Sequence, residues 1–67
     1  MGIQARLAKN LRRLRTEKGL SQESLAFEAK IHRTYISDLE RGSRNPTITV
    51  VERLAKALAV SVGKLVD

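Results

Sequence analysis

The chain has 67 residues, enough for one modest hydrophobic core, and its 13 Lys and Arg against 7 Asp and Glu give a net charge of +6. It contains no cysteine and no long apolar run, which argues against disulfides, thiolate metal sites, a membrane span and a secretion signal. We therefore expect a single domain over residues 1–67 that is soluble, lies in the reducing cytoplasm and binds a polyanion.

The first predicted helix covers about residues 3–18. Leu7, Leu11 and Leu14 follow the i, i+4, i+7 spacing of a helix that buries one stripe of side chains. Gly19 comes directly after this stretch, and glycine commonly ends a helix.

Two short helices joined by a tight turn are predicted next, over about residues 21–42. Ser21 is a good N-cap for a helix over residues 22–29, and residues 30–32 form the turn with Ile31 as its apolar anchor. The next helix covers residues 33–41 and ends at Gly42. This arrangement is a helix-turn-helix, in which the second short helix enters the major groove of DNA.

A fourth helix is predicted over residues 50–58. Thr49 and Glu52 have the spacing of a capping box at its start. Ser61 is expected to cap a final short turn in which Leu65 folds back on the core. No segment shows the sustained two-residue alternation of a strand, so the fold class is all-α.

The helix over residues 33–41 has two different sides. Ile36 and Leu39 fall on one side, with Tyr35 at its border, so this side is expected to face the core. The polar side presents the four residues that we expect to read bases: Arg33, Thr34, Ser37 and Asp38. Arginine can grip guanine in a fork, threonine can contact the thymine methyl group, and aspartate can accept a hydrogen bond from cytosine.

Other interpretations of these four residues remain open. Asp38 could instead pair with Arg41 on the surface, and any exposed helix face tolerates Ser37 and Thr34. Arg33 is different, because the helix dipole repels a cation in the first turn. Local stability therefore gives no reason for an arginine at that position.

A second group is expected to contact phosphates. Gln22 is the first helical residue after a cap, where free backbone N–H groups favour an anion. The group comprises Gln22, His32, Tyr35, Arg41, Arg44 and Asn45. Arg41 could alternatively serve only to stabilise the end of its helix. His32 is the only histidine and has no cysteine partners, so we expect no metal site.

Sequence-specific binding is expected to need two copies of the chain. One reading helix contacts a few base pairs, and each good contact discriminates by only about 1–3 kcal/mol. A twofold dimer would match a roughly palindromic operator. Val50, Val62 and Val66 look surplus to the inward stripe and are the candidate dimer interface, unless they are merely scattered surface valines.

The chain resembles the Cro-type, lambda-repressor-like helix-turn-helix family over nearly all of its length, and two segments carry the resemblance. Residues 15–26 read RTEKGLSQESLA, and residues 36–42 read ISDLERG with Pro46 following. The resemblance implies a compact five-helix domain in which Gln22 contacts a phosphate and the positions of Arg33, Thr34 and Asp38 read bases.

The resemblance also implies an ion pair between Arg15 and Glu40. His32 departs from the pattern, since Ser, Thr or Asp is more usual there as the cap of the reading helix. Residues 32–37 (HRTYIS) and 43–46 (SRNP) are similar to the small controller proteins of restriction–modification systems.

The leading hypothesis is a homodimeric, sequence-specific regulator of transcription that binds double-stranded DNA. The alternative is an antitoxin-like protein-interaction module in which DNA binding is secondary. We expect no enzyme, no cofactor, no small-molecule substrate and no membrane partner. The reason is that the sole histidine and the scattered acids form no nucleophile–base or metal constellation, and the apolar stripes are needed for the core.

Overall fold

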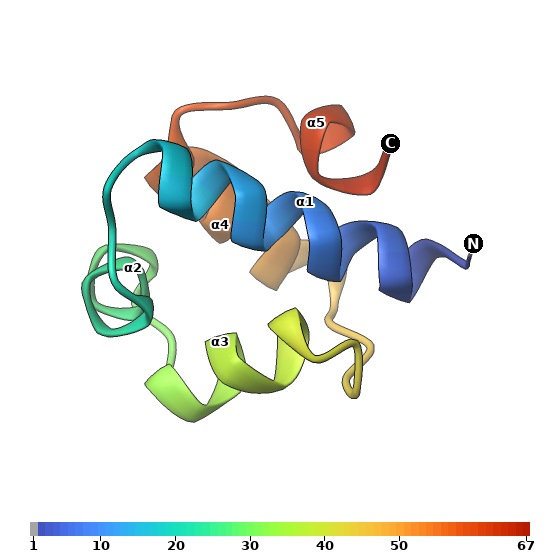
Figure 1. Cartoon of the computed structure of the whole chain (residues 1–67), viewed down its shortest axis with the longest axis horizontal. Coiled ribbons are helices and arrows are strands. Elements are labelled where there is room, and N and C mark those ends of the chain that lie inside the picture. The colour runs from blue at the N-terminus through green and yellow to red at the C-terminus, as the bar shows by residue number, and fades with distance from the viewer. Residues whose placement is uncertain (1) are drawn as a thin grey trace.

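The computed structural model describes residues 2–67, and these form five α-helices. They are α1 (Ile3–Glu17), α2 (Gln22–Ala29), α3 (Arg33–Glu40), α4 (Ile48–Leu58) and α5 (Val62–Val66). In the view of Figure 1, α1 crosses the centre with α5 above it and α3 below it, and α2 lies at one end. No strand occurs within residues 2–67, so the all-α prediction is confirmed for that range.

The core takes side chains from every helix. The largest fully buried ones are Leu11, Leu25, Ile36, Leu39, Leu54, Leu58 and Leu65. The stripes predicted from helical spacing are therefore the ones that the fold buries. Ile31 in the turn and Val60 before α5 pack against this core while half-buried, as expected for apolar anchors.

Side-chain caps begin three of the helices. Ser21 Oγ accepts a hydrogen bond from the Ser24 backbone N–H at 2.9 Å, and Ser61 Oγ accepts one from Lys64 at 3.4 Å. At the start of α4 the cap is Thr47, whose Oγ1 accepts from the Val50 N–H at 3.3 Å.

The predicted capping box of Thr49 and Glu52 is therefore wrong. The chain is still extended at Thr47, and the helix begins at Ile48, two residues earlier than expected. Thr49 is then already inside the first turn, where its hydroxyl has no cap position to occupy. Thr47 has Val50 and not Glu or Gln three residues on, so it lacks the capping-box spacing, yet its hydroxyl is the one that caps the helix.

Four helix ends are closed by residues in the left-handed conformation. Gly19 and Gly42 follow α1 and α3 with φ of 72°, a backbone geometry that glycine adopts without strain. Lys30 and Ala59 end α2 and α4 with φ of 59° and 57°, although both carry a Cβ. Such a conformation is uncommon for residues other than glycine, asparagine and aspartate.

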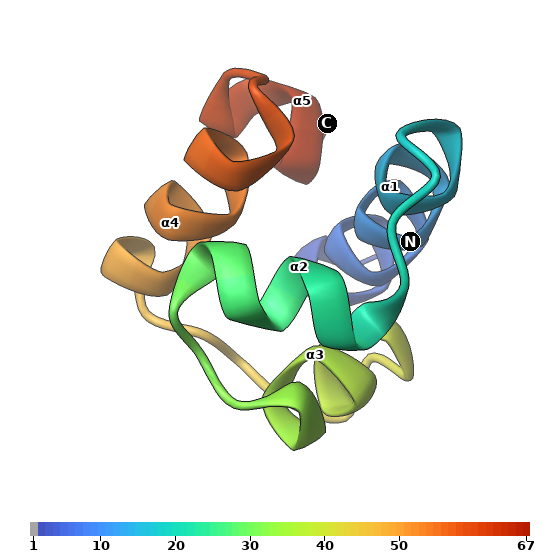
Figure 2. The ribbon, with the colours of Figure 1, turned by 90° about the vertical axis from the view of Figure 1, so that its left-hand side faces the viewer.

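The outer side of α3 is left uncovered by the other helices. Figure 2 shows α2 crossing directly over α3, with α1 and α4 on opposite sides of α2. At the other end of the molecule, Asn10 donates to the Leu65 carbonyl and Arg6 to the Val66 carbonyl, both at 3.0 Å, which fixes α5 against α1. None of the helices within residues 2–67 is long and apolar enough to cross a membrane.

Candidate nucleic-acid interface

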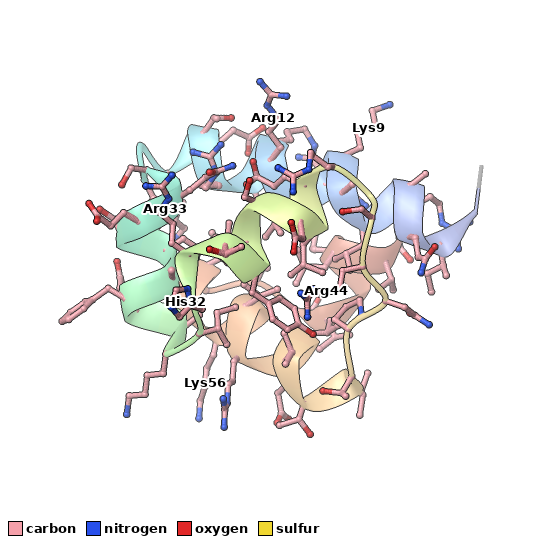
Figure 3. The ribbon with its side chains drawn as sticks, turned by 90° about the horizontal axis from the view of Figure 1, so that it is seen from below. Lys9, Arg12, His32, Arg33, Arg44 and Lys56 are labelled. Carbon is pink, nitrogen blue, oxygen red and sulfur yellow. The ribbon has the colours of Figure 1, made fainter. Side chains whose placement is uncertain are left out.

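The first turn of α3 presents two polar side chains outward. Ile36 and Leu39 anchor the helix from beneath and are buried, whereas Arg33 and Thr34 are exposed. Neither Arg33 nor Thr34 has a side-chain hydrogen bond or ion pair with any other residue in the range 2–67. Figure 3 looks onto α3 from its uncovered side and shows Arg33 extending outward from the start of the helix.

The start of α3 also lacks a side-chain cap. His32 occupies the N-cap position and is exposed, but its imidazole accepts no hydrogen bond from the first turn. The cap is missing because His32 stands where the family usually has Ser, Thr or Asp, and an imidazole is a poorer N-cap than Ser, Thr, Asp or Asn. The N-terminal end of α3 is therefore the least internally satisfied part of this helix.

Farther along α3, charged side chains already hold one another. The Asp38 carboxylate forms ion pairs with Arg41 and, at 3.2 Å, with Arg44. Arg41 also donates to the Ser37 hydroxyl at 2.9 Å. The ion pair between Asp38 and Arg41, which was the alternative interpretation of Asp38, is therefore present. The Asp38 carboxylate holds Arg41 and Arg44 beside the polar side of α3.

Arg44 is fixed from a second direction. Its guanidinium carbon lies 4.4 Å from the centroid of the half-buried Tyr35 ring, within cation–π range. This contact and the ion pair with Asp38 hold the loop between α3 and α4 against the reading helix. Asn45, in the same loop, is exposed.

A satisfied polar cluster lies at the opposite end of α3. Arg15 donates to Glu40 through Nε at 2.6 Å and through Nη2 at 3.0 Å, which is the ion pair that the resemblance implies. Arg15 also donates to the Leu20 carbonyl at 2.8 Å. The two charged side chains are only 13% and 5% exposed, and the hydrogen bond with Glu40 raises the pKa of Arg15. The guanidinium therefore stays charged, and the cluster ties α1 to α3.

Gln22 belongs to the same cluster. Its Nε2 donates to Glu40 Oε1 at 3.0 Å, so the first residue of α2 is joined to the last residue of α3. Sequence reasoning missed this bond because it links residues eighteen positions apart. The amide keeps a second N–H, because Nε2 carries two hydrogens. Gln22 therefore has a donor left for a phosphate while it supports the helix pair.

The valines expected at the dimer interface are not fully exposed. Val50, Val62 and Val66 are each half-buried and pack against the core. They are therefore not surplus to the core, although each keeps some exposed surface, and their place in a dimer interface stays a prediction.

The exposed large apolar residues lie elsewhere. Ile48 is 72% exposed and Ile3 is 54% exposed, and both line an open hollow where the starts of α1 and α4 meet the end of α5. Leu7, Pro46 and Val66 also line this hollow. Phe27 on α2 is 84% exposed and lies outside it. We term the surface formed by Ile3, Ile48 and Val66 the α1–α4–α5 apolar face.

Comparison with known proteins places these features in a family. Residues 11–65 match the helix-turn-helix family model. The control protein C.BamHI from Bacillus amyloliquefaciens is 46% identical over 66 residues, which cover 97% of this chain and 82% of that protein.

Two solved structures have the same fold and related sequences. The restriction–modification controller protein C.AhdI from Aeromonas hydrophila has a TM-score of 0.90 at 42% identity, covering 92% of this chain and 94% of that one. The structure of C.Esp1396I bound to a 25 base pair operator site has a TM-score of 0.85 at 41% identity, covering 91% and 80%. The chain belongs to the helix-turn-helix family, among relatives that include restriction–modification controller proteins.

Proposed function

We propose that this protein binds double-stranded DNA sequence-specifically through α3 and regulates transcription in the cytoplasm, as the controller of a restriction–modification system. The observation that carries the proposal is the first turn of α3. Arg33 and Thr34 are exposed there without an internal partner, on a rigid helix that Ile36 and Leu39 anchor to the core. The similarity to an operator-bound relative supports it.

Base reading is assigned to the polar side of α3. Arg33 is placed to grip a guanine with its two-pronged donor set, and Thr34 to set its methyl group against thymine. Ser37 keeps a hydroxyl donor while it accepts from Arg41. Asp38 reads a cytosine only if its carboxylate turns from the two arginines that it holds in the free protein.

Phosphate contacts surround this reading surface. Arg41 and Arg44 stand at the C-terminal end of α3, and the Tyr35 ring and the Asp38 carboxylate hold Arg44 in place. Such preorganisation lowers the entropy lost on binding. Gln22, His32, Tyr35 and Asn45 complete the set, and these contacts position the protein without reading sequence.

The protein acts as a homodimer in this proposal. Each base contact discriminates by about 1–3 kcal/mol, so one reading helix selects too few base pairs to find a site in a genome. The α1–α4–α5 apolar face, which includes Val66, supplies an interface, and the half-buried Val50 on α4 and Val62 on α5 remain candidates for its extension. Two copies joined there would read a roughly palindromic operator.

The dimer has its own test with a matched control. Ile48→Glu places a charge on the α1–α4–α5 apolar face, whereas Phe27→Glu places the same charge on an exposed apolar side chain of α2, outside that face. Sedimentation equilibrium should give a dimer for the native chain and for Phe27→Glu, and a monomer for Ile48→Glu. A monomeric native chain at micromolar concentration, or dissociation by Phe27→Glu alone, would contradict this interface.

DNA binding is tested by selecting duplexes from a random pool and measuring their affinity as the salt concentration rises. The selected duplex should be bound more tightly than a scrambled duplex of the same length. The logarithm of the affinity should fall linearly with the logarithm of salt, by about 0.9 for each phosphate contact. Equal affinity for selected and scrambled duplexes would overturn sequence-specific binding.

The second candidate is a protein-interaction module of the antitoxin-like kind. Its supporting observation is Phe27, 84% exposed on α2 with Glu23 and Glu28 beside it. This function predicts a stoichiometric protein partner together with DNA affinity no greater than background. The salt titration therefore separates the two candidates.

A further inference from the structure

Asp38 brings a negative charge to the polar side of α3, the side that we propose enters the major groove. Its side chain lies in the last turn of the helix and is only 18% exposed. Oδ1 accepts a hydrogen bond from Arg41, and Oδ2 accepts one from Arg44 at 3.2 Å. Figure 3, which looks onto the uncovered side of α3, shows Arg44 beside this helix. We term Asp38, Arg41 and Arg44 the α3 ion-pair cluster.

Contacts beyond the ion pairs give this cluster a defined geometry. The Asp38 backbone carbonyl accepts hydrogen bonds from the Ser43 N–H and from the Ser43 hydroxyl, both at 3.1 Å. The Arg44 guanidinium carbon lies 4.4 Å from the centroid of the Tyr35 ring. An arginine that turns toward a phosphate therefore has to give up contacts that it makes in the free protein.

The stability of α3 gives little reason for a carboxylate at this position. An anion in the last turn of a helix faces the negative end of the helix dipole, which destabilises it. The pair with Arg41 has i,i+3 spacing and the arginine is 62% exposed, so the pair stabilises the helix only slightly. A carboxylate beside the reading helix also repels the phosphates of DNA. We therefore look for its use in binding.

The cluster presents less positive charge to DNA than its two arginines alone would. One carboxylate held between two guanidinium groups leaves one net positive charge instead of two. Attraction between cations and phosphates supplies essentially all of the affinity for non-specific DNA. Asp38 therefore weakens binding to DNA of any sequence, unless a base takes the place of the arginines. Specificity is a difference of affinities, and a repulsive element against the wrong partner can supply it.

We propose that Asp38 determines specificity by restraining Arg41 and Arg44 on non-cognate DNA. The proposal rests on the proposed DNA-binding function. In the major groove, cytosine and adenine present amino donors, whereas guanine and thymine present acceptors. Where an amino group meets Asp38, the carboxylate stays hydrogen-bonded and the two arginines turn to phosphates. Where an acceptor meets it, the contact is repulsive and the arginines stay with the carboxylate.

The test compares Asp38→Asn with Glu17→Gln. Each variant replaces a carboxylate that is paired with an arginine by an amide of similar shape. Glu17 pairs with Arg13 at 3.5 Å on α1, outside the cluster, and both side chains of that pair are exposed. The probes are the selected duplex and a scrambled duplex of the same length, titrated by fluorescence anisotropy over a range of salt concentrations.

The restraint predicts that Asp38→Asn gains affinity for the wrong DNA. It should bind the scrambled duplex about three- to tenfold more tightly at about 0.15 M salt, and its salt slope there should steepen by about 0.9, as for one further phosphate contact. Its affinity for the selected duplex should be unchanged or lower, because the amide lacks the charge-assisted bond to a base. The ratio of the two affinities should therefore fall about tenfold. Glu17→Gln should leave this ratio unchanged.

A second measurement tests whether the effect passes through the arginines. Arg41→Ala should lower the salt slope more on the selected duplex than on the scrambled one, because Arg41 is released only on the selected duplex. In the Asp38→Asn background, Arg41→Ala should lower the slope equally on both duplexes, because the restraint is already absent. Such a difference between backgrounds is the coupling that a double-mutant cycle measures. A purely structural role for Asp38 would not produce it.

Four results would overturn the proposal. The first is an affinity ratio in Asp38→Asn that is unchanged or higher. The second is a ratio that falls only because the selected duplex is lost, which would make Asp38 a plain reader of a base. The third is an equal effect of Arg41→Ala on the two duplexes in the native background. The fourth is no preference of the native chain for selected over scrambled DNA. Only this fourth result removes the proposed function together with the inference.

Discussion

The two ends of α3 contrast sharply within one helix of 8 residues. At its C-terminal end, the Glu40 carboxylate accepts hydrogen bonds from Arg15 and Gln22 and is almost fully buried. At its N-terminal end, Arg33 and Thr34 are exposed and have no partner among residues 2–67.

The contrast separates two uses of polar side chains. A buried charge is kept only when other groups satisfy it, so the cluster around Glu40 fixes how α1, α2 and α3 are packed. An exposed arginine in the first turn of a helix opposes the helix dipole and gains nothing from the fold. The first end supports the structure, and the second is available to a ligand.

The largest expected effect is at the closed end. Glu40→Ala leaves the Arg15 guanidinium largely buried without its carboxylate, which should lower the free energy of unfolding by about 3 kcal/mol. Urea denaturation followed by circular dichroism measures this change. Glu17→Ala, which breaks the exposed pair with Arg13, is the control and should cost less than about 0.5 kcal/mol. Similar losses of unfolding free energy in Glu40→Ala and Glu17→Ala would contradict the claim that the Glu40 cluster supports the fold.

At the open end, the effect should fall on binding instead of stability. Arg33→Ala should weaken binding to the selected duplex by about 1–3 kcal/mol and relax the preference at one base pair, because the variant cannot form the forked hydrogen bonds to a base. Its unfolding midpoint in urea should equal or slightly exceed that of the native chain, because the variant removes a cation that opposes the helix dipole. Anisotropy titrations on selected and scrambled duplexes measure the change, and an equal loss on both would show that Arg33 does not read a base.

The start of α4 has a side-chain cap and the start of α3 has none, so variants at the two starts extend the comparison. Thr47→Ala removes the cap of α4 and should cost about 1 kcal/mol of folding free energy. Thr49→Ala, two residues later, makes the same chemical change inside the helix and should be nearly neutral. Thermal unfolding of both variants checks the assignment, and the reverse order would place the start of α4 at Thr49 after all.

The smallest expected effect is a gain. His32→Ser supplies the missing cap to α3 and should stabilise the fold by about 0.5 kcal/mol. Urea denaturation measures it against Asn45→Ala, a change at an exposed loop residue that makes no side-chain hydrogen bond within residues 2–67. A lower free energy of unfolding in His32→Ser would mean that the imidazole itself stabilises the start of α3, which would contradict the missing cap.

The sequence predicted much of this fold because local rules agreed with one another. Leu11, Leu25, Leu39 and Leu54 all fell on stripes with helical spacing, and Gly42 stood where α3 ends. The start of α4 escaped prediction because Thr49 and Glu52 have the spacing of a capping box, whereas Thr47 caps the helix without that spacing. Which of the two threonines caps α4 depends on the path of the loop from α3, and tertiary packing determines that path.

The candidate site was predictable in its residues more than in its contacts. Arg33 and Thr34 could be placed on the outer side of α3 from helical spacing alone. The hydrogen bond from Gln22 to Glu40 and the stacking of Arg44 on Tyr35 join residues from different elements. A local sequence pattern therefore cannot predict them. The exposure of Ile48 likewise depends on where α5 packs.

The most direct test of the central claim is to titrate the isotopically labelled protein with the selected duplex and follow its backbone amide resonances, which its size of 7.5 kDa makes practical. The account predicts the largest shifts at residues 32–38 and 44–45 and at Gln22, with the buried residues of α4 little changed. Shifts concentrated at Phe27 and its neighbours on α2, with residues 32–38 unmoved, would contradict it.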